Sequence, residues 1–419
     1  MILDSMKSCR RFFHQIPEPG WMEYRTTINI INILKDMGYD VMYGKSIHGG
    51  PRMGLPSEEK ISKYKEGLTF DVDFDVSEIL EGYTGALVKL DTKKKGPTIG
   101  LRFDIDALEI PESDDPSHIP TKENFKSTIP GAMHACGHDG HITIGLFIAK
   151  WLMENKDNLT GEYILTFQPA EEGVRGAKSM VNSGNYEDID YFLGLHIGIN
   201  LPSGSIGVGS ENIFATSKLD IQYHGVSAHA GALPEEGKNA LLGAASCALN
   251  LHTLPQHSGG MSRINVGVLK AGTGRNVIPD TATLQVEVRG ENDTIVSYLV
   301  ERAKEIAKGS AIQYGLDYSV EEVGSALALE HHDFEFYSEM ETFLESKGFN
   351  VIRDNKFNAS EDVTYYMNKV IKDGGKAIHF LIGSDLKAGH HNEKFDFNED
   401  DLERSFEVLK DTILYLNER

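Results

Sequence analysis

The chain has 419 residues, of which 40% are hydrophobic and 25% are charged, a composition typical of a globular protein with a full core. Its 41 basic and 63 acidic residues give a formal net charge of −22, which argues against nucleic acid or a membrane as a partner, since both require a basic protein surface. Three scattered cysteines and an N-terminus without an apolar run of signal-peptide length predict a soluble, cytoplasmic protein.

The first two hundred residues predict an α/β domain. Residues 3–37 have the apolar spacing of helices, interrupted at 17–20, and residues 43–82 are polar and rich in turn residues. We interpret this second segment as an excursion from the core with a short helix at 57–64. Apolar strands that then alternate with helices predict a mixed, mostly parallel sheet covered by helices on both faces. The strands are expected at 98–105, 162–167 and 190–196, and the helices at 140–155, capped by Asp139, and at 174–183.

A second domain is predicted after about residue 213, where the order of elements changes to β-α-β-β-α-β, the ferredoxin-like arrangement. Its expected elements are strand 218–224, helix 237–251, strands 263–270 and 281–289, helix 292–314 and strand 317–323. The α/β pattern then resumes with helices 333–347 and 360–369, strand 377–382 and a terminal helix from 399. We therefore expect residues 1–212 and 326–419 to form one domain into which residues 213–325 are inserted as an α+β domain.

The strongest chemical signal is the sequence MHACGHDGH, in which Cys136, His138 and His141 lie within six residues. Thiolate and imidazole are the usual ligands of zinc and related ions. A loop with a buried thiol and surface histidines is the plain alternative. The metal hypothesis gains weight because other ligand-type residues follow the ends of predicted strands, where sites form in open α/β sheets. These residues are Asp104, Asp106, Glu171, Glu172 and His196.

The adjacent Glu171 and Glu172 suggest a division of labour, because neighbouring side chains at a strand-to-helix turn point in different directions. One carboxylate can bind a cation while the other transfers protons. A further imidazole is offered after strand 377–382 by His390 or His391, and spacing alone leaves the choice between them open.

These motifs resemble those of the dinuclear-metal amidohydrolase and exopeptidase family, which includes aminoacylases, hippurate hydrolases, indole-acetyl-amino-acid hydrolases and carboxypeptidases of the G type. The resemblance covers nearly the whole chain. Two segments, residues 43–82 and the run AGHHNEKFDF at 388–397, resemble one branch of this family in particular. The motifs are RRxxHxxPE from Arg10, RFDIDAL at 102–108, MHACGHDGH at 133–141, FQPAEEG at 167–173, GLH at 194–196, GVSAHAGALPEEG at 225–237, RNVIPD at 275–280, VEVRG at 286–290, SED at 360–362 and His391-x-x-x-Phe395.

The resemblance implies a metal-dependent hydrolase that cleaves the amide bond of a small N-acyl amino acid and holds two divalent ions, Mn²⁺ or Zn²⁺. Glu171 matches the general base, and Asp106 matches the acidic residue that orients a metal ligand. Asp104 and His141 are expected to support the site rather than to bind metal. The expected metal ligands are Cys136, whose sulfur is shared between the ions, His138, Glu172, His196 and His391.

The inserted domain is implied to act as a lid and dimerisation domain that recognises the substrate. His229 matches a residue that binds the developing oxyanion, often across a dimer interface, and a capping or buried histidine is the alternative. Asn276 and Arg289 match residues that hold the substrate carboxylate, and Arg275 adds a second positive charge or is a solvated rim residue. A homodimer is expected, or a complex with a second, related subunit. The competing hypotheses are a hydrolase that uses Cys136 as its nucleophile and a non-catalytic partner subunit.

Overall fold

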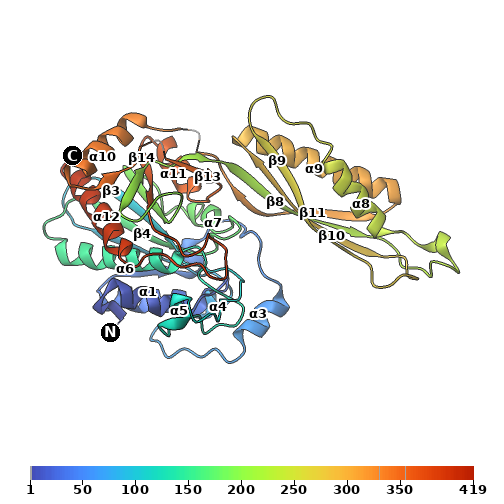
Figure 1. Ribbon diagram of the computed structural model, residues 1–419, viewed down its shortest axis with the longest axis horizontal. Coiled ribbons are helices and arrows are strands. Elements are labelled where there is room, and N and C mark those ends of the chain that lie inside the picture. The colour runs from blue at the N-terminus through green and yellow to red at the C-terminus, as the bar shows by residue number, and fades with distance from the viewer. Residues whose placement is uncertain (1, 330, 354) are drawn as a thin grey trace. The chain divides into compact units, whose positions relative to one another are not determined.

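The computed structural model describes residues 2–329, 331–353 and 355–419. The described chain divides into two compact units, each with its own hydrophobic core. The first unit comprises Met1–Glu211, His331–Asn358 and Asp362–Arg419, and the second comprises Asn212–Glu330 with Ala359–Glu361. Figure 1 shows the elements of both units along the chain. Among the described residues, no helix is both long and apolar enough to cross a membrane.

The first unit contains, within its described residues, an eight-stranded sheet in the order β1-β2-β4-β3-β5-β14-β6-β12. The neighbouring strands β4, β3, β5 and β14 are parallel, whereas β1, β2 and β6 join in antiparallel pairs. The strands are β1 (Val41–Tyr43), β2 (Ala86–Asp91), β3 (Thr98–Asp104), β4 (Glu162–Gln168), β5 (Tyr191–Ile197), β6 (Ser205–Val208), β12 (Asn350–Val351) and β14 (Lys376–Ile382). Asp104 lies opposite Gln168 in this register, so β3 and β4 end at the same edge.

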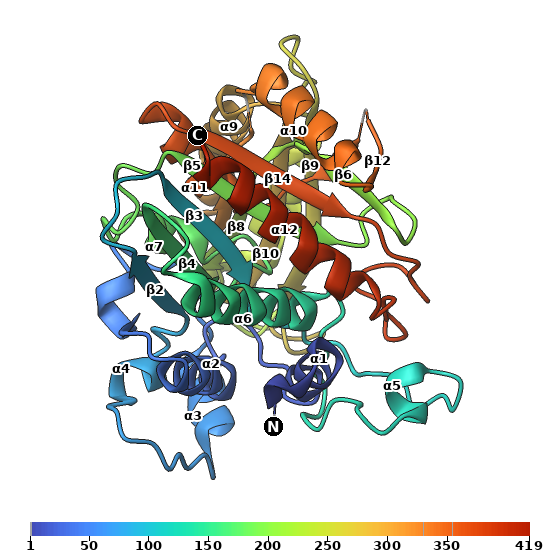
Figure 2. The same cartoon turned by 90° about the vertical axis from the view of Figure 1, so that its left-hand side faces the viewer.

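Helices cover both faces of this sheet. In Figure 2, α6 (His138–Asn155) and α12 (Asp401–Asn417) lie in front of β3 and β14, and α7 (Ala177–Val181) and α11 (Thr364–Lys372) lie behind them. The central strands are buried along nearly their whole length because they are covered on both sides. The other helices of this unit are α1 (Met6–His14), α2 (Tyr24–Asp36), α3 (Glu58–Lys65), α4 (Ser77–Leu80), α5 (Ile119–Lys122), α10 (Phe334–Ser346) and 3₁₀ turns at Ile2–Asp4 and Gly44–Ile47.

The second unit has the predicted ferredoxin-like order β8-α8-β9-β10-α9-β11. Its described strands form a four-stranded antiparallel sheet in the order β11-β8-β10-β9, and α8 and α9 bury their apolar side chains against one face. The elements are β8 (Ala215–His224), a 3₁₀ turn at Pro234–Glu236, α8 (Ala240–Leu251), β9 (Ser262–Ala271), β10 (Thr281–Gly290), α9 (Asp293–Tyr314) and β11 (Asp317–Ala326). Near the unit boundary, β7 (Glu211–Ile213) pairs with β13 (Lys356–Ala359). The expected fold class is thus confirmed.

Three local predictions were wrong. Helix α6 begins at His138, with Gly137 as its N-cap at φ 92°, so Asp139 lies inside the first turn and does not cap the helix. The helix expected at 174–183 shrinks to Ala177–Val181, because residues 170–176 form a turn that sets the two glutamates. Helix α11 begins at Thr364, four residues later than expected.

Candidate metal centre and active site

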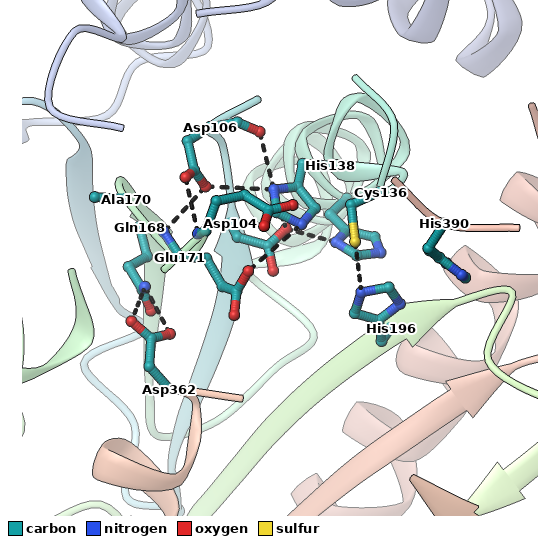
Figure 3. A network of polar contacts seen from close by, with 12 residues as sticks. Asp104, Asp106, Cys136, His138, Gln168, Ala170, Glu171, His196, Asp362 and His390 are labelled. Carbon is teal, nitrogen blue, oxygen red and sulfur yellow. Dashed lines mark hydrogen bonds and ion pairs between the residues drawn. The ribbon is translucent and has the colours of Figure 1, made fainter. Parts of the chain in front are cut away.

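The carboxyl edge of the central sheet brings together the predicted ligand-type residues of the first unit. Figure 3 shows Cys136 and His138 between the ends of β3 and β5, with Asp106 on one side and His390 on the other. The ligand atoms of three overlapping groups lie within 4.8 Å of one another in each group. The groups are Cys136, Glu172 and His391; His138, Glu171 and Glu172; and Cys136, His196 and His390. Cys136 and Glu172 each occur in two of these groups, and His138 also forms a group with Asp104 and His141.

His138 has the geometry of a metal ligand. Its Nδ1–H donates to the backbone carbonyl of Asp106 at 2.9 Å, which leaves a lone pair on Nε2. This buried Nε2 makes no hydrogen bond with the described residues and lies 3.9 Å from Oε2 of Glu171. Burial opposes protonation, but the Asp104 carboxylate, Asp106 and Cys136 together outweigh it and raise the pKa of His138 well above its usual value. The surroundings of this imidazole therefore favour positive charge, which a cation can supply.

Cys136 and His196 face each other at the end of β5. The Sγ of Cys136 lies 3.5 Å from Nε2 of His196, whose Nδ1–H donates to the carbonyl of Ile197 at 2.9 Å. Burial, followed by the neighbouring His141 and His390, holds the pKa of His196 well below its usual value. The imidazole is therefore neutral at physiological pH, with its Nε2 lone pair directed at the thiol.

Glu172 and His391 complete the cluster from two other segments. Nε2 of His391 lies 3.5 Å from Oε1 of Glu172, and the backbone N–H of His391 donates to the carbonyl of Ala135 at 2.8 Å. Hydrogen bonds to Cys136 and then to Glu172 raise the pKa of His391 to about 10. The adjacent His390 instead donates from Nε2 to the carbonyl of Ile197 at 3.2 Å. Both imidazoles thus lie near the cluster, but they contact different partners.

The turn after β4 separates Glu171 from Glu172. Ala170 and Val174 both adopt left-handed backbone conformations, at φ 51° and φ 56°. This conformation is strained for Val174, because its side chain is β-branched. The carboxylate of Asp106 holds this turn, because Oδ1 accepts from the N–H of Glu171 at 3.0 Å and Oδ2 from that of Glu172 at 2.9 Å. Glu171 itself is 8% exposed, and Figure 3 shows its carboxylate directed toward His138.

Asp104 and His141 form hydrogen bonds next to the cluster. Nδ1–H of His141 donates to Oδ1 of Asp104 at 2.5 Å, and Nε2 of His141 accepts from the N–H of Ile197 at 3.1 Å. Because both ring nitrogens are engaged, His141 has no lone pair for a metal. Arg102 donates to Oδ2 of Asp104 at 2.6 Å and to Oδ1 of Asp362 at 2.8 Å, in a fully buried network.

A second buried network holds the start of α6, and no role was predicted for it. Asp139 accepts from Nε of Arg10 at 2.7 Å and from Nδ1 of His14 at 2.8 Å. The other ring nitrogen of His14 donates to Glu112 at 2.9 Å. Arg10 and His14 belong to the RRxxHxxPE motif. They are four residues apart, so their side chains lie on the same face of α1. Long-range pairing of this kind leaves no local signal around Asp139.

The predicted substrate-binding residues lie in the second unit and divide into two places. The exposed His229 accepts at Nδ1 from the N–H groups of Gly231 and Ala232, both at 3.1 Å, so its hydrogen is on Nε2. The carbonyl of Asn276 accepts from Ala230 at 3.0 Å, which places Asn276 and the exposed Arg275 beside the His229 loop.

Arg289 is at the opposite end of β10. Thr281 and Arg289 are separated by about 27 Å along the strand, at roughly 3.4 Å per residue. The guanidinium of Arg289 is half-exposed and lies 3.1 Å from Glu287. Within one chain, therefore, Arg289 cannot contact the same small molecule as His229 and Asn276.

An open cavity of about 800 Å³ adjoins the cluster on the His390 side. Its walls include the apolar side chains of Ile199, Leu201, Phe357 and Leu386. Gly198 and His390 also line it, and each is within two residues of a predicted metal ligand. The cavity can therefore accept an apolar group attached to a molecule bound at the cluster.

Comparison with known proteins agrees with this geometry. Residues 100–415 match the family model described as peptidase family M20/M25/M40. A homolog of one subunit of p-aminobenzoyl-glutamate hydrolase, from Haemophilus influenzae, is 45% identical, over 96% of this chain and 95% of its own. The indole-3-acetyl-aspartic acid hydrolase of Enterobacter agglomerans is 42% identical, over 99% and 96%. The crystal structure of an aminobenzoyl-glutamate utilization protein from Klebsiella pneumoniae has a TM-score of 0.80 at 35% identity, over 97% and 94%.

These matches confirm the family resemblance found in the motifs. They span nearly the whole chain, so both units belong to the shared architecture. The donor set of sulfur, imidazole and carboxylate groups at the sheet edge is one that binds divalent metal ions. The chain belongs to peptidase family M20/M25/M40 and is a metal-dependent amidohydrolase.

Proposed function

We propose that this protein hydrolyses the amide bond of p-aminobenzoyl-glutamate to p-aminobenzoate and glutamate. The relatives at 45% and 42% identity are named for p-aminobenzoyl-glutamate and indole-3-acetyl-aspartic acid. Both molecules join an aromatic acyl group to an amino acid with a second carboxylate. The cavity beside His390 supports this class, because its mixed lining offers the apolar side chains of Ile199, Leu201 and Phe357 to an aromatic ring next to the cluster.

The observation that carries the proposal is the convergence of five donor groups beside Glu171. The proposed ligands are Cys136, His138, Glu172, His196 and His391, with Cys136 shared between two ions. The buried, unbonded Nε2 of His138 and the neutral His196 support metal binding. A set of one sulfur, three nitrogens and one carboxylate suits Zn²⁺ or Mn²⁺. Two such cations would polarise the amide carbonyl and lower the pKa of a water molecule.

Glu171 is the proposed general base. Its carboxylate is nearly buried and lies 3.9 Å from Nε2 of His138, so it can reach a water molecule at the cluster. It takes the proton of that water as the oxygen attacks the amide carbon, and it then gives the proton to the nitrogen of the departing glutamate. Asp106 keeps Glu171 in place through the backbone of the turn.

The inserted unit is the proposed lid and dimerisation domain, and it supplies the substrate contacts. Nε2–H of His229 is an exposed donor that suits the developing oxyanion. Arg289, Asn276 and Arg275 would bind the carboxylates of the glutamate.

We further propose a homodimer. Arg289 and His229 are at opposite ends of β10, so their joint use on one substrate requires two copies of the chain. The alternative is a complex with a second, related subunit, which is supported by relatives whose names denote one subunit of a hydrolase. We place the protein in the cytoplasm.

The function is tested by assaying turnover of three amides with purified protein, with and without added Zn²⁺ or Mn²⁺. We expect p-aminobenzoyl-glutamate to be cleaved faster than indole-3-acetyl-aspartate and far faster than hippurate, and chelation to abolish all turnover. Equal cleavage of the three amides would favour a broader N-acyl-amino-acid amidohydrolase or carboxypeptidase. Full activity after complete metal removal would favour Cys136 as a nucleophile, and metal binding without any hydrolysis would favour a non-catalytic subunit.

A further inference from the structure

A second cavity, of about 440 Å³, lies in the first unit on the Asp106 side of the cluster. One wall is α3, from the excursion at 43–82, together with the start of α2, and the other is the segment leading into the Cys136 loop. Gly131 lies in that segment, and no atom is within 4 Å of the position that a Cβ would occupy there. The lining residues are Pro19, Met22, Arg25, Lys60, Lys63, Tyr64, Glu109, Ile129, Pro130, Gly131 and Ala132.

The cavity carries positive charge in a chain with a net charge of −22. Lys60 is neutralised by Glu109, the carboxylate in the lining, at 2.7 Å. Among the described residues, the side chain of Lys63 forms no ion pair or hydrogen bond, whereas Arg25 interacts electrostatically with the buried carboxylate of Glu18, which Tyr64 also contacts. Lys63 and Arg25 together still exceed the charge of this one carboxylate, so the concave surface attracts an anion.

Three chain segments connect this cavity to the metal-ligand cluster. Glu109 is three residues from Asp106, and Ala132 is four residues from Cys136, so the Cα atoms are at most about 11 and 14 Å apart. The antiparallel hydrogen bonds between Leu108 and Met133, at 3.0 and 3.1 Å, hold these two segments together.

The third connection passes through Arg175. Its Nε donates to the carbonyl of Glu172 at 2.8 Å, and its Nη1 donates to the carbonyl of Gly54 at 3.0 Å. Arg175 thus links Gly54, in the excursion at 43–82, to the backbone of Glu172, a proposed metal ligand. The next residue, Leu55, is 49% exposed, and α3 begins three residues after it.

We propose that this cavity is a subsite for a carboxylate that an extended substrate carries beyond the hydrolysed amide. The proposal rests on the function proposed above, and it names acyl oligoglutamates as the substrate class. Arg25 and Lys63 would bind the terminal carboxylate, and the side chains of Tyr64 and Ile129 would contact the chain that leads to it. Because Glu109 and Ala132 in the lining are at most about 11 and 14 Å from Asp106 and Cys136, a ligand with a second glutamate is long enough to extend from the cluster to this cavity.

The test compares binding of p-aminobenzoyl-γ-glutamyl-glutamate and p-aminobenzoyl-glutamate by isothermal titration calorimetry. Metal-loaded Glu171→Gln protein is used so that hydrolysis does not consume the ligands. We expect the longer ligand to bind about tenfold more tightly, as one charge-assisted carboxylate contact provides. Lys63→Gln and Arg25→Gln, added separately, should remove most of this preference, and raised salt should weaken it.

The matched control is Lys308→Gln, which removes the same charge from the exposed side of α9. It should keep the full preference. Lys63 is exposed on α3, so its replacement does not threaten folding. Equal affinity for the two ligands, or a preference that survives both cavity substitutions, would overturn the subsite. A wild-type protein that binds the longer ligand through Lys63 yet cleaves neither amide would leave the subsite standing and refute the proposed function.

Discussion

The carboxylate of Asp106 accepts a hydrogen bond of 3.0 Å from the backbone N–H of Glu171, which follows the neighbouring strand β4. Its second oxygen accepts from the N–H of Glu172 at 2.9 Å. One side chain therefore sets the directions of two adjacent glutamates, so that one can bind a cation while the other remains available for proton transfer.

Asp106→Asn tests this arrangement. An amide has one acceptor oxygen, so one of the two backbone N–H groups would face an N–H₂ donor and the turn would shift. We expect kcat and metal affinity to fall together by about 10–100-fold, the usual effect of losing a group that orients a metal ligand. Metal titration and steady-state kinetics measure both quantities. A variant with native kcat and native metal affinity would show that the turn holds without Asp106.

Glu171→Gln should separate proton transfer from metal binding. The amide retains the shape of the side chain but cannot accept the proton, so turnover should fall by about 10²–10⁴-fold. Metal content, measured by elemental analysis, should remain that of the wild type. Retention of near wild-type turnover would show that another group is the base, whereas loss of metal would place Glu171 among the ligands.

Mixing two inactive variants tests whether His229 acts across a dimer. Glu171→Gln and His229→Ala lose different parts of the proposed machinery, and a mixed dimer would contain one site with both residues intact. After unfolding and refolding together, about a quarter of all sites should be active, since half of the dimers are mixed. Activity that stays at the level of the separate variants would place both residues in one chain's site.

Arg289→Ala should raise KM for p-aminobenzoyl-glutamate by about tenfold or more, because a bidentate contact to a carboxylate is lost. Arg302→Ala, on the exposed side of α9, serves as the charge-matched control and should leave KM unchanged. An unchanged KM in Arg289→Ala would remove this residue from substrate binding.

The buried His14 predicts a defined dependence of stability on pH. Burial and the neighbouring Arg10 oppose protonation, but hydrogen bonds to Asp139 and Glu112, together with the negative charge of these carboxylates, outweigh them and raise the pKa of His14 to about 9. A raised folded-state pKa contributes stability that is complete below about pH 6.5 and is lost as pH rises through 9, by on the order of 3 kcal/mol. Chemical denaturation at several pH values measures this loss.

His14→Gln is the control for that measurement. The variant should be less stable than wild type at pH 6, and the difference between the two should shrink as pH rises from 6.5 to 9. Curves that run parallel across this range would show that His14 is not protonated in the native state.

The metal-ligand cluster could be anticipated from sequence because parallel strands end at one edge of a sheet. Asp106, Glu172 and His196 each lie at or after the end of an apolar strand, and the structure brings these strand ends together. The choice between His390 and His391 was not available from spacing, since both imidazoles approach the cluster and only their hydrogen-bond partners distinguish them.

Other features depend on contacts that have no local sequence signal. Asp139 has the composition of a helix cap, but its carboxylate is bound by Arg10 and His14, more than 120 residues earlier. The left-handed conformation of Val174, which the turn after β4 imposes, cannot be predicted from the sequence, because valine rarely adopts it. The cavity beside Arg25 arises where four distant segments meet, and none of them alone resembles a binding motif.

The central claim is that two cations are held by Cys136 and its neighbours while Glu171 remains uncoordinated. A crystal structure of protein reconstituted with Zn²⁺, with anomalous data collected at the zinc edge, tests it directly. We expect two anomalous peaks per chain, both within about 2.3 Å of the Cys136 sulfur and bounded by the imidazoles and Glu172. Peaks at Asp104 and His141 instead, or a zinc ion bound by Glu171, would contradict the account.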